Sequence, residues 1–216
     1  MTAWEHSLRV PLIISAPWLP STHGKTHGGM AEMCDFYRTL SDLAGINPST
    51  VDKGVQCDGL ASVFSDPSVA GKTYAFSQTQ RISIPDLRTE PEQCVRDCQN
   101  QKLYRKLPPV ADGFFAPSCF SYNHQIEWMV YTVRSAEWRL TESLRWNGQK
   151  LCAMKPSTSA AANATALAFT ELYDHRHDTS AFDLDVAEYD NVVASYPDVV
   201  ATMREALETY VVYCPA

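Results

Sequence analysis

Residues 129–144, MVYTVRSAEWRLTESL, form a stretch rich in aromatic and β-branched side chains with one short polar interruption. Side chains of these types favour the extended, pleated backbone of a sheet, so strands are expected at 129–134 and 138–144. The three residues between them, SAE, match the length of a hairpin connection. The stretch therefore predicts two paired antiparallel strands.

Other strands and a closing helix are expected on either side of this hairpin. Residues 73–77 and 169–173 have the composition of short strands. Near the end of the chain, apolar residues recur at helical spacing across 197–213, which predicts an amphipathic helix. Together these elements predict a small antiparallel sheet with a C-terminal helix.

The first part of the chain has a different pattern. Val10 and residues 12–14 form an apolar run ended by prolines. Such a run predicts a fully buried strand of the kind found inside a parallel sheet. Residues 30–44 then carry apolar side chains at the spacing of one helix face, and Gly45 provides a C-terminal stop.

This change of pattern predicts two domains and a fold class of α+β / α/β. Residues 1–72 are assigned to the C-terminal end of an α/β domain. Residues 73–216 are assigned to a subdomain that holds the antiparallel sheet and the closing helix. Within it, residues 79–125 form a proline-rich insert with three cysteines, and a segment of this length is usually functional or held by disulfides.

Composition excludes two classes of partner. The chain has 216 residues and a net charge of −7, so no basic face is expected for nucleic acid. No apolar stretch is long enough to cross a bilayer, so no membrane span is expected. The apolar run near the start is short and follows Glu5, which argues against a signal peptide.

Cysteine content and one sequon favour the secretory pathway. The chain has seven cysteines, and Asn163 begins an Asn-Ala-Thr glycosylation sequon. Cys94, Cys98 and Cys119 are the disulfide candidates in the insert; a metal site is the alternative for them. The odd count leaves at least one thiol free or paired outside the chain, and spacing does not give the connectivity.

Several blocks of the sequence, taken in order, are similar to one enzyme family. They are EHSLRVPLII (5–14), DFYRTLSDLAG (35–45), CDGL (57–60), AFSQTQR (75–81), MVYTVR with WRLT (129–134, 138–141), and ELYDHRHD with NVV (171–178, 191–193). With these blocks the chain resembles the C-terminal part of a sulfatase in the alkaline phosphatase superfamily, most closely the iduronate-2-sulfatase-like branch. Val130 departs from a glycine of the family pattern, and Thr179 departs from a proline.

The resemblance implies a sulfuric ester hydrolase that acts on sulfated sugars in a lysosomal or extracellular setting. The full-length family uses a formylglycine, made from the cysteine of a Cys-x-Pro-x-Arg motif, and a calcium ion held by acidic residues. This chain contains neither that motif nor an Asp-Asp pair. We therefore expect no catalytic residue, metal ligand or cofactor within the chain, inactivity when it is alone, and an N-terminal catalytic part as its partner.

Arg134 is the one candidate for contact with substrate. It ends a strand in a matched block, where a guanidinium faces either an anionic sugar or an internal carboxylate. The cluster of His175 and His177 with Asp174 and Asp178 is expected to be a solvated turn rather than a metal site. Two other functions stay open: a non-catalytic module that binds glycans or complements a separate catalytic half, and another hydrolase of the alkaline phosphatase superfamily.

Overall fold

A computed structural model describes residues 3–47, 50, 57–66, 68–82, 126–156, 166–178 and 188–215. Cys94, Cys98 and Cys119, and the sequon at Asn163, lie outside the described residues. The chain forms two compact units. The first comprises Met1–Ser77, Tyr131–Thr141 and Thr170–Tyr210; the second comprises Gln78–Val130, Glu142–Phe169 and Val211–Ala216. The domain boundary expected between residues 72 and 73 stays a prediction.

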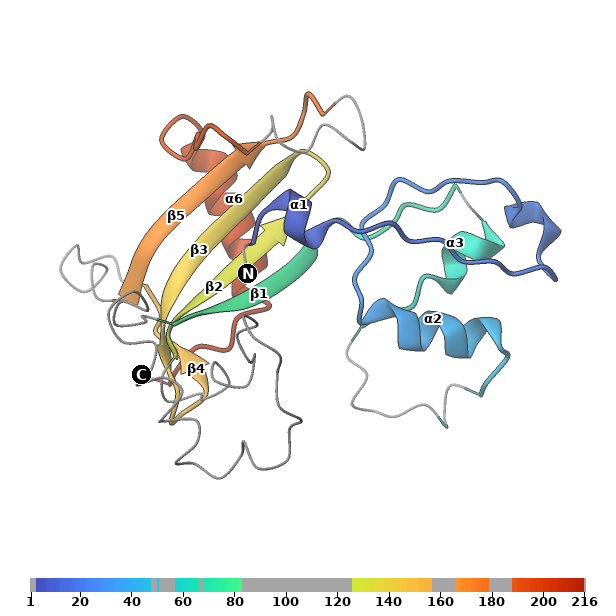
Figure 1. The fold of residues 1–216 in the computed structure, drawn as a ribbon, viewed down its shortest axis with the longest axis horizontal. Helices are drawn as coiled ribbons and strands as arrows, with labels where there is room; N and C mark the ends of the chain where they lie inside the picture. The colour runs from blue at the N-terminus through green and yellow to red at the C-terminus, as the bar shows by residue number, and fades with distance from the viewer. Residues whose placement is uncertain are drawn as a thin grey trace, which may run out of the picture. The chain divides into compact units, whose positions relative to one another are not determined.

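The protein has a mixed α+β fold built on an open antiparallel sheet (Figure 1). The sheet has five strands in the order β1-β2-β3-β4, with β5 paired to β3. The strands are β1 (Ala75–Ile82), β2 (Ile126–Arg134), β3 (Trp138–Asn147), β4 (Cys152–Ala153) and β5 (Leu167–Asp174). The small antiparallel sheet expected from the sequence is thus confirmed, with one more strand, β4, which is too short for its sequence to show.

The hairpin of β2 and β3 forms as its sequence predicts. The backbone N–H of Ser135 donates to the carbonyl of Trp138 at 2.8 Å, and the Ser135 hydroxyl accepts from the N–H of Trp138 at 3.0 Å. These bonds close the turn and set the register of the two strands. Side chains of both strands, Val133, Leu140 and Leu144 among them, are fully buried.

In the first unit, helix α6 (Pro197–Glu208) buries Val200, Met203 and Leu207 at helical spacing. Just beyond the helix, the ring of Tyr210 stacks on Phe76 of β1 with ring centroids 5.0 Å apart. The expected closing helix is therefore confirmed, but it ends before residue 213. Among the described residues, no helix is long and apolar enough to cross a bilayer.

Helix α2 (Asp35–Leu43) is a shorter form of the helix expected at 30–44. Gly45 follows it with a φ of 69°, a left-handed conformation that glycine adopts without steric cost. The N–H of Ile46 donates to the carbonyl of Ser41 at 2.9 Å, and that of Gly45 to Asp42 at 3.1 Å. These two bonds are a Schellman motif, so the predicted glycine stop is confirmed.

Helix α2 buries its polar side. Asp35 is 0% exposed and Thr39 is also buried, whereas Met33, just ahead of the helix, is 70% exposed and Leu40 is exposed too. The periodicity correctly indicated an amphipathic helix, but the polar side is the buried side. The reason is that Asp35 and Thr39 bond to Lys72 and to the start of helix α3 (Ala61–Ser65), as described below.

The buried strand expected at residues 10–14 does not form. The chain has a short helix, α1 (Glu5–Leu8), and then no regular structure until the single turn η1 (Pro20–Thr22). Ile13 is 91% exposed, and Val10 and Leu12 are exposed as well. A strand needs a neighbouring strand for its N–H and C=O groups, and no described residue supplies one here.

Two segments of the first unit approach each other closely at glycines. Met30 and Lys72 form an antiparallel bridge, and the ring Nε2 of His27 lies 2.9 Å from the carbonyl oxygen of Val69. A Cβ added to Gly71 would lie 2.6 Å from the Cα of Gly29. Since that neighbour is backbone, it cannot move aside as the end of a flexible side chain would.

We predict that Gly71→Ala destabilises the protein by about 1–3 kcal/mol, because the new methyl group forces the two backbones apart. Urea denaturation followed by circular dichroism measures the change. Gly28→Ala is the matched control, since a Cβ there meets nothing within 4 Å. Equal stability of the two variants would contradict the close approach.

Candidate functional site

Six ionisable side chains from well-separated parts of the sequence meet inside the first unit. They come from α1, the β2–β3 hairpin, the end of β5 and the residues before α6. We call them the buried charge cluster; its members are Glu5, Arg134, Arg139, His175, Asp178 and Glu188.

Glu5 is the residue on which the two arginines converge. Its Oε2 accepts from the Nε of Arg134 at 3.2 Å and from the Nη2 of Arg139. Its Oε1 lies 3.5 Å from Arg9 one helical turn later. Its backbone N–H donates to the Oε2 of Glu188 at 2.6 Å. Although Glu5 lies on a helix of only four residues, it is 4% exposed, because these partners surround it.

Glu188 and His175 extend the cluster towards the end of β5. The Oε1 of Glu188 lies 2.6 Å from the Nε of Arg139 and 3.3 Å from the Nε2 of His175. The other ring nitrogen of His175 lies 2.9 Å from the Oδ2 of Asp178, which is also 3.7 Å from the Nη2 of Arg134. His175 is thus buried between two carboxylates, so the expected solvated turn is wrong for this residue. Residues 176–177 do form a turn, and His177 and Asp178 are exposed, as expected.

The cluster is close to electrically balanced, since three carboxylates face two guanidinium groups and one imidazole. Burial alone would raise the pKa of Glu5, but the charges of Arg139 and Arg134 outweigh it and lower that pKa to about 2. Burial also opposes ionisation of Glu188, and the hydrogen bond from His175 with the charge of Arg139 lowers its pKa. Both carboxylates are therefore ionised at neutral pH.

A calcium ion does not fit this cluster. Ligand atoms of Glu5, His175 and Glu188 lie within 4.8 Å of one another, a spacing that one ion could span. The Oε2 of Glu5, however, already accepts from Arg134 and Arg139, and the Oε1 of Glu188 forms an ion pair with Arg139. A metal ion would therefore meet two buried cations at short range. The arrangement suits a structural ion-pair network in which every charge has a partner.

Arg134, the candidate for substrate contact, is placed by the structure in an internal ion pair. Its side chain is buried and lies against Glu5 and Asp178. Its guanidinium also donates to the carbonyl of Ser135 in the hairpin turn. The internal carboxylate was one of the two partners considered for it, and a role in substrate binding stays a prediction.

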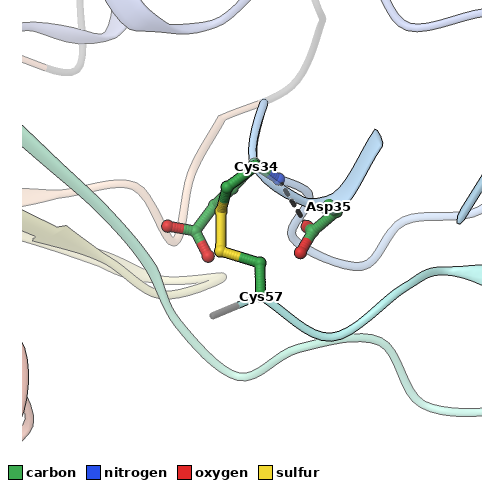
Figure 2. A group of neighbouring side chains, drawn as sticks. Cys34, Asp35 and Cys57 are labelled. Atoms are coloured by element: carbon green, nitrogen blue, oxygen red, sulfur yellow. Dashed lines mark hydrogen bonds between the residues drawn. A yellow bond between two sulfur atoms is a disulfide. The ribbon is translucent and has the colours of Figure 1, made fainter. Parts of the chain in front are cut away.

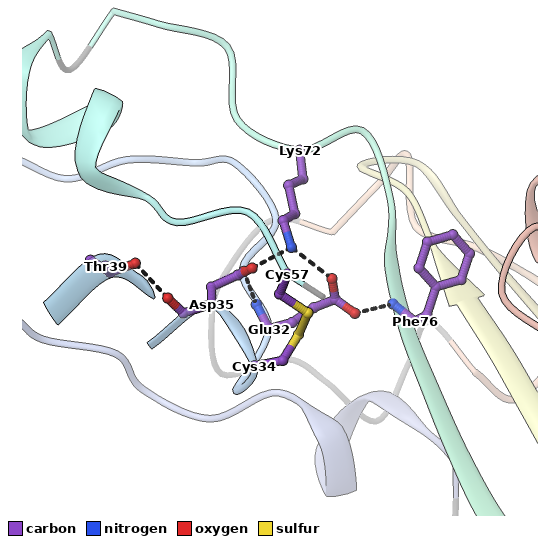
Figure 3. The surroundings of a disulfide bond; sticks show 7 residues. All are labelled: Glu32, Cys34, Asp35, Thr39, Cys57, Lys72 and Phe76. Atoms are coloured by element: carbon purple, nitrogen blue, oxygen red, sulfur yellow. Dashed lines mark hydrogen bonds and ion pairs between the residues drawn. A yellow bond between two sulfur atoms is a disulfide. The ribbon is translucent and has the colours of Figure 1, made fainter. Parts of the chain in front are cut away.

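A second cluster surrounds the disulfide between Cys34 and Cys57, whose Cα atoms are 5.7 Å apart (Figure 2). Figure 3 shows Lys72 between two carboxylates: its ammonium lies 2.9 Å from the Oε2 of Glu32 and also donates to the Oδ1 of Asp35. Burial disfavours the charged ammonium, but its hydrogen bonds to Asp35 and Glu32 outweigh that and raise the pKa of Lys72. The lysine therefore stays charged.

Backbone N–H groups donate hydrogen bonds to the remaining carboxylate oxygens of this second cluster. The Oδ2 of Asp35 accepts from the N–H of Glu32 at 2.8 Å, and the Oε1 of Glu32 accepts from the N–H of Phe76 at 2.9 Å. The hydroxyl of Thr39 donates to the carbonyl of Asp35 at 2.7 Å and accepts from the N–H of Leu60 at 2.8 Å. Each carboxylate oxygen has a partner, and the cysteine sulfurs are joined to each other, so this cluster does not fit a metal ion either.

A second disulfide, Cys152–Cys214, joins β4 to the chain end within the second unit. Alongside it, the N–H of Cys214 donates to the carbonyl of Ala153 at 2.8 Å. The paired cysteines are separated by 62 residues here and by 23 in Cys34–Cys57. No spacing motif in the sequence indicates either pair, so sequence reasoning missed both.

A third group lies at the start of β3. The guanidinium of Arg176 lies 4.5 Å from the ring centroid of Trp138 and 5.3 Å from that of Tyr196. Its Nε and Nη2 bond to the two carboxylate oxygens of Asp174 at 2.9 and 2.6 Å. These hydrogen bonds lower the pKa of Asp174 to about 2. Since Asp174 already neutralises Arg176, this group does not offer an open site for an anion.

No protein-family model matches the chain, and no curated protein matches it either.

We predict that Glu5→Gln destabilises the protein at pH 7 by about 3 kcal/mol, because two buried guanidinium groups lose their shared anion. The folded-state pKa of Glu5 is about 2, below the ordinary 4.5, so its contribution is present above pH 4.5. It is lost as pH falls from about 4.5 towards 2. The difference between the wild type and Glu5→Gln should therefore shrink over that range.

Urea denaturation at pH 7, 4 and 3 measures this difference. Glu137→Gln, at an exposed position in the hairpin turn, is the control and should change stability little at any of the three pH values. A gap between wild type and Glu5→Gln that stays constant from pH 7 to 3 would contradict the assigned role of Glu5.

We predict that Lys72→Met costs about 2–3 kcal/mol, since it leaves the fully buried Asp35 without a cation. Adding Asp35→Asn to the Lys72→Met variant should recover part of the lost stability, because it removes the unpaired negative charge. Thermal and urea unfolding of both variants measure the effect, with the exposed Lys25→Met as control. If the double variant is less stable by the full sum of both single changes, the two side chains are not coupled.

Proposed function

We propose that the chain is the C-terminal portion of an iduronate-2-sulfatase-like sulfuric ester hydrolase that acts on sulfated sugars, and that it contributes scaffold rather than reacting groups. The family's calcium ion and formylglycine belong, in this proposal, to a separate catalytic part. The parent enzyme is assigned to the secretory pathway, as a lysosomal or extracellular protein.

The observation that carries the proposal is that sequence blocks similar to the sulfatase pattern bond to one another in the fold. Glu5 of the first block pairs with Arg134 and Arg139 of the hairpin blocks, at sequence separations of 129 and 134 residues. Arg134 pairs in turn with Asp178 in the last block. The blocks that carry the resemblance are thus the ones that meet in the buried charge cluster.

Two more pairs of matched sequences are also bonded to each other. Asp35 and Thr39 belong to the second block, and Thr39 bonds to Leu60 of the Cys-Asp-Gly-Leu block. Near the end of the chain, the side chain of Asn191 accepts from the N–H of Leu172 at 3.0 Å, which joins the Asn-Val block to the Glu-Leu-Tyr block. The matched residues thus include those that hold the first unit together.

Chemistry within the described residues supports the non-catalytic part of the proposal. In neither cluster is the nucleophilic group of a sulfatase free: the cysteines of the second are in a disulfide, and the acids and the histidine of the first are held in ion pairs. The carboxylates that could hold a cation are already used by lysine and arginine. The arrangement is that of a rigid framework.

The proposal is tested with 4-methylumbelliferyl sulfate, a fluorogenic sulfate ester. The chain alone should show no turnover above a buffer blank. Mixed or co-expressed with the N-terminal catalytic part of an iduronate-2-sulfatase-like enzyme, it should restore turnover at least about tenfold over either part alone. Turnover by the chain alone, or no gain on mixing, would overturn the proposal.

Variants sharpen this test. Arg139→Ala should abolish the gain by breaking the buried charge cluster, whereas Lys150→Ala, at an exposed turn, should leave it intact. Circular dichroism of each variant separates a failure to fold from a failure to complement.

A further inference from the structure

Cys34–Cys57 is the more accessible of the two disulfides that the structure describes. Cys34 is exposed and Cys57 is half-buried, whereas Cys152 is only 3% exposed. The N–H of Cys214 also donates to the carbonyl of Ala153 at 2.8 Å, which holds the second disulfide in place. Thiol–disulfide exchange requires a thiolate to reach one of the sulfurs. A small dithiol should therefore open Cys34–Cys57 first.

Opening this disulfide changes the ligands that the second cluster offers. Glu32, Cys34, Asp35 and Cys57 each have one ligand atom within 4.8 Å of the other three (Figure 2). Two sulfurs bound to one tetrahedral zinc ion, at a Zn–S distance of about 2.3 Å, lie about 3.8 Å apart. With the disulfide closed, the sulfurs are joined to each other and the cluster does not fit a metal ion. As two separate thiolates, they complete a set of four ligands.

The two carboxylates of this set already face a cation. The Oε2 of Glu32 and the Oδ1 of Asp35 both bond to the ammonium of Lys72 (Figure 3). The other oxygen of Glu32 accepts from the N–H of Phe76, and the other oxygen of Asp35 accepts from the N–H of Glu32. Hydrogen bonds of this kind orient a carboxylate towards a metal ion. Each acid therefore has one oxygen fixed by the backbone and one that points at a cation.

Charge favours a divalent ion over the ammonium once the disulfide is open. In the closed form, Lys72 faces two carboxylates. With both thiols ionised, the four ligands would carry four negative charges, and a divalent ion offsets more of that charge than an ammonium does. The side chain of Lys72 is 21% exposed, so its flexible end can move into water.

We propose that reduction of the Cys34–Cys57 disulfide creates a zinc site. Its ligands are the thiolates of Cys34 and Cys57 and one oxygen each from Glu32 and Asp35, and Zn²⁺ takes the place of the Lys72 ammonium. Thiolates and carboxylates are both zinc ligands, and four ligands suit its tetrahedral geometry. Calcium and magnesium bind oxygen rather than sulfur, so they do not suit this set. The site is independent of the proposed function.

The reduction is a thiol–disulfide exchange with a dithiol. A thiolate of the dithiol attacks one sulfur, the Cys34–Cys57 bond breaks, and a mixed disulfide forms. The second thiolate of the dithiol then displaces the remaining cysteine and closes a cyclic disulfide. Two electrons thus pass from the dithiol to the two cysteines, which take up two protons. When Zn²⁺ binds the two thiolates, both protons pass to the solvent.

Metal titration of the full chain tests the site. The chain is reduced with dithiothreitol, separated from it by gel filtration under argon, and checked for folding by circular dichroism. In calorimetry, the reduced chain should bind one more equivalent of Zn²⁺ than the disulfide form. Co²⁺ in place of Zn²⁺ should give the near-ultraviolet absorption of a cobalt–thiolate bond. No additional equivalent, Co²⁺ bound without this absorption, or a fold lost on reduction and not regained with Zn²⁺ would each overturn the proposal.

A cysteine variant locates the additional equivalent. The double variant Cys34→Ser/Cys57→Ser should not bind it under the same reducing treatment, whereas the remaining cysteines are unchanged. The reduced wild type is the matched control for folding, since it also lacks this disulfide. An additional equivalent retained by the double variant would place the zinc elsewhere in the chain and overturn the proposal.

Two further variants separate a ligand from a residue that only stabilises the cluster. Changes one step removed from a metal cost about 10–100-fold in affinity, so Glu32→Gln, which removes a direct ligand, should weaken Zn²⁺ binding at least about tenfold. Lys72→Met disturbs the same cluster but removes the competing cation, so it should bind Zn²⁺ at least as tightly as the wild type. Equal weakening in both variants would overturn the assigned ligands.

Discussion

The first unit depends on one carboxylate shared by two buried arginines. Glu5 lies on a single helical turn that would not hold its shape alone, and Arg134 and Arg139 would carry unpaired charge inside the protein without it. The helix turn that holds Glu5 and the two arginines therefore depend on each other. As a result, the start of the chain is held in position against the hairpin and against Glu188. The apolar segment that follows therefore begins at a defined position.

Helix α2 also has polar side chains on its buried side. A helix of this size normally buries its apolar side. In α2 the acidic side is buried instead, because Asp35 bonds to Lys72 from a distant segment of the chain. Lys72, Asp35 and Glu32 form a compact ionic centre with the Cys34–Cys57 disulfide beside it (Figure 3). Met33 and Leu40 are left exposed as a result. Two exposed apolar features, the outer side of α2 and residues 10–14, thus occur in the same unit as these buried ionic contacts.

Features set by neighbouring residues could be predicted from the sequence, and features set by distant partners could not. The β2–β3 hairpin, the glycine stop of α2 and the amphipathic α6 each follow from a few consecutive residues. The buried charge cluster joins residues as far as 183 positions apart, and neither disulfide pair has a spacing motif. Periodicity located α2 but did not give its orientation, because that depends on where Lys72 lies. The strand expected at 10–14 failed for the same reason: an apolar run specifies a strand only when a sheet is present to receive it.

Acid does not easily release the anchored start of the chain. The pKa of Glu5 is held near 2, and that of Glu188 is also lowered, so both pairs with Arg139 persist in mildly acidic solution. Asp174 likewise keeps its bonds to Arg176, since its pKa lies near 2. A protein of an acidic compartment would keep these ion pairs intact there. The position of the start of the chain is therefore a fixed property of the fold in mildly acidic solution rather than one switched by pH.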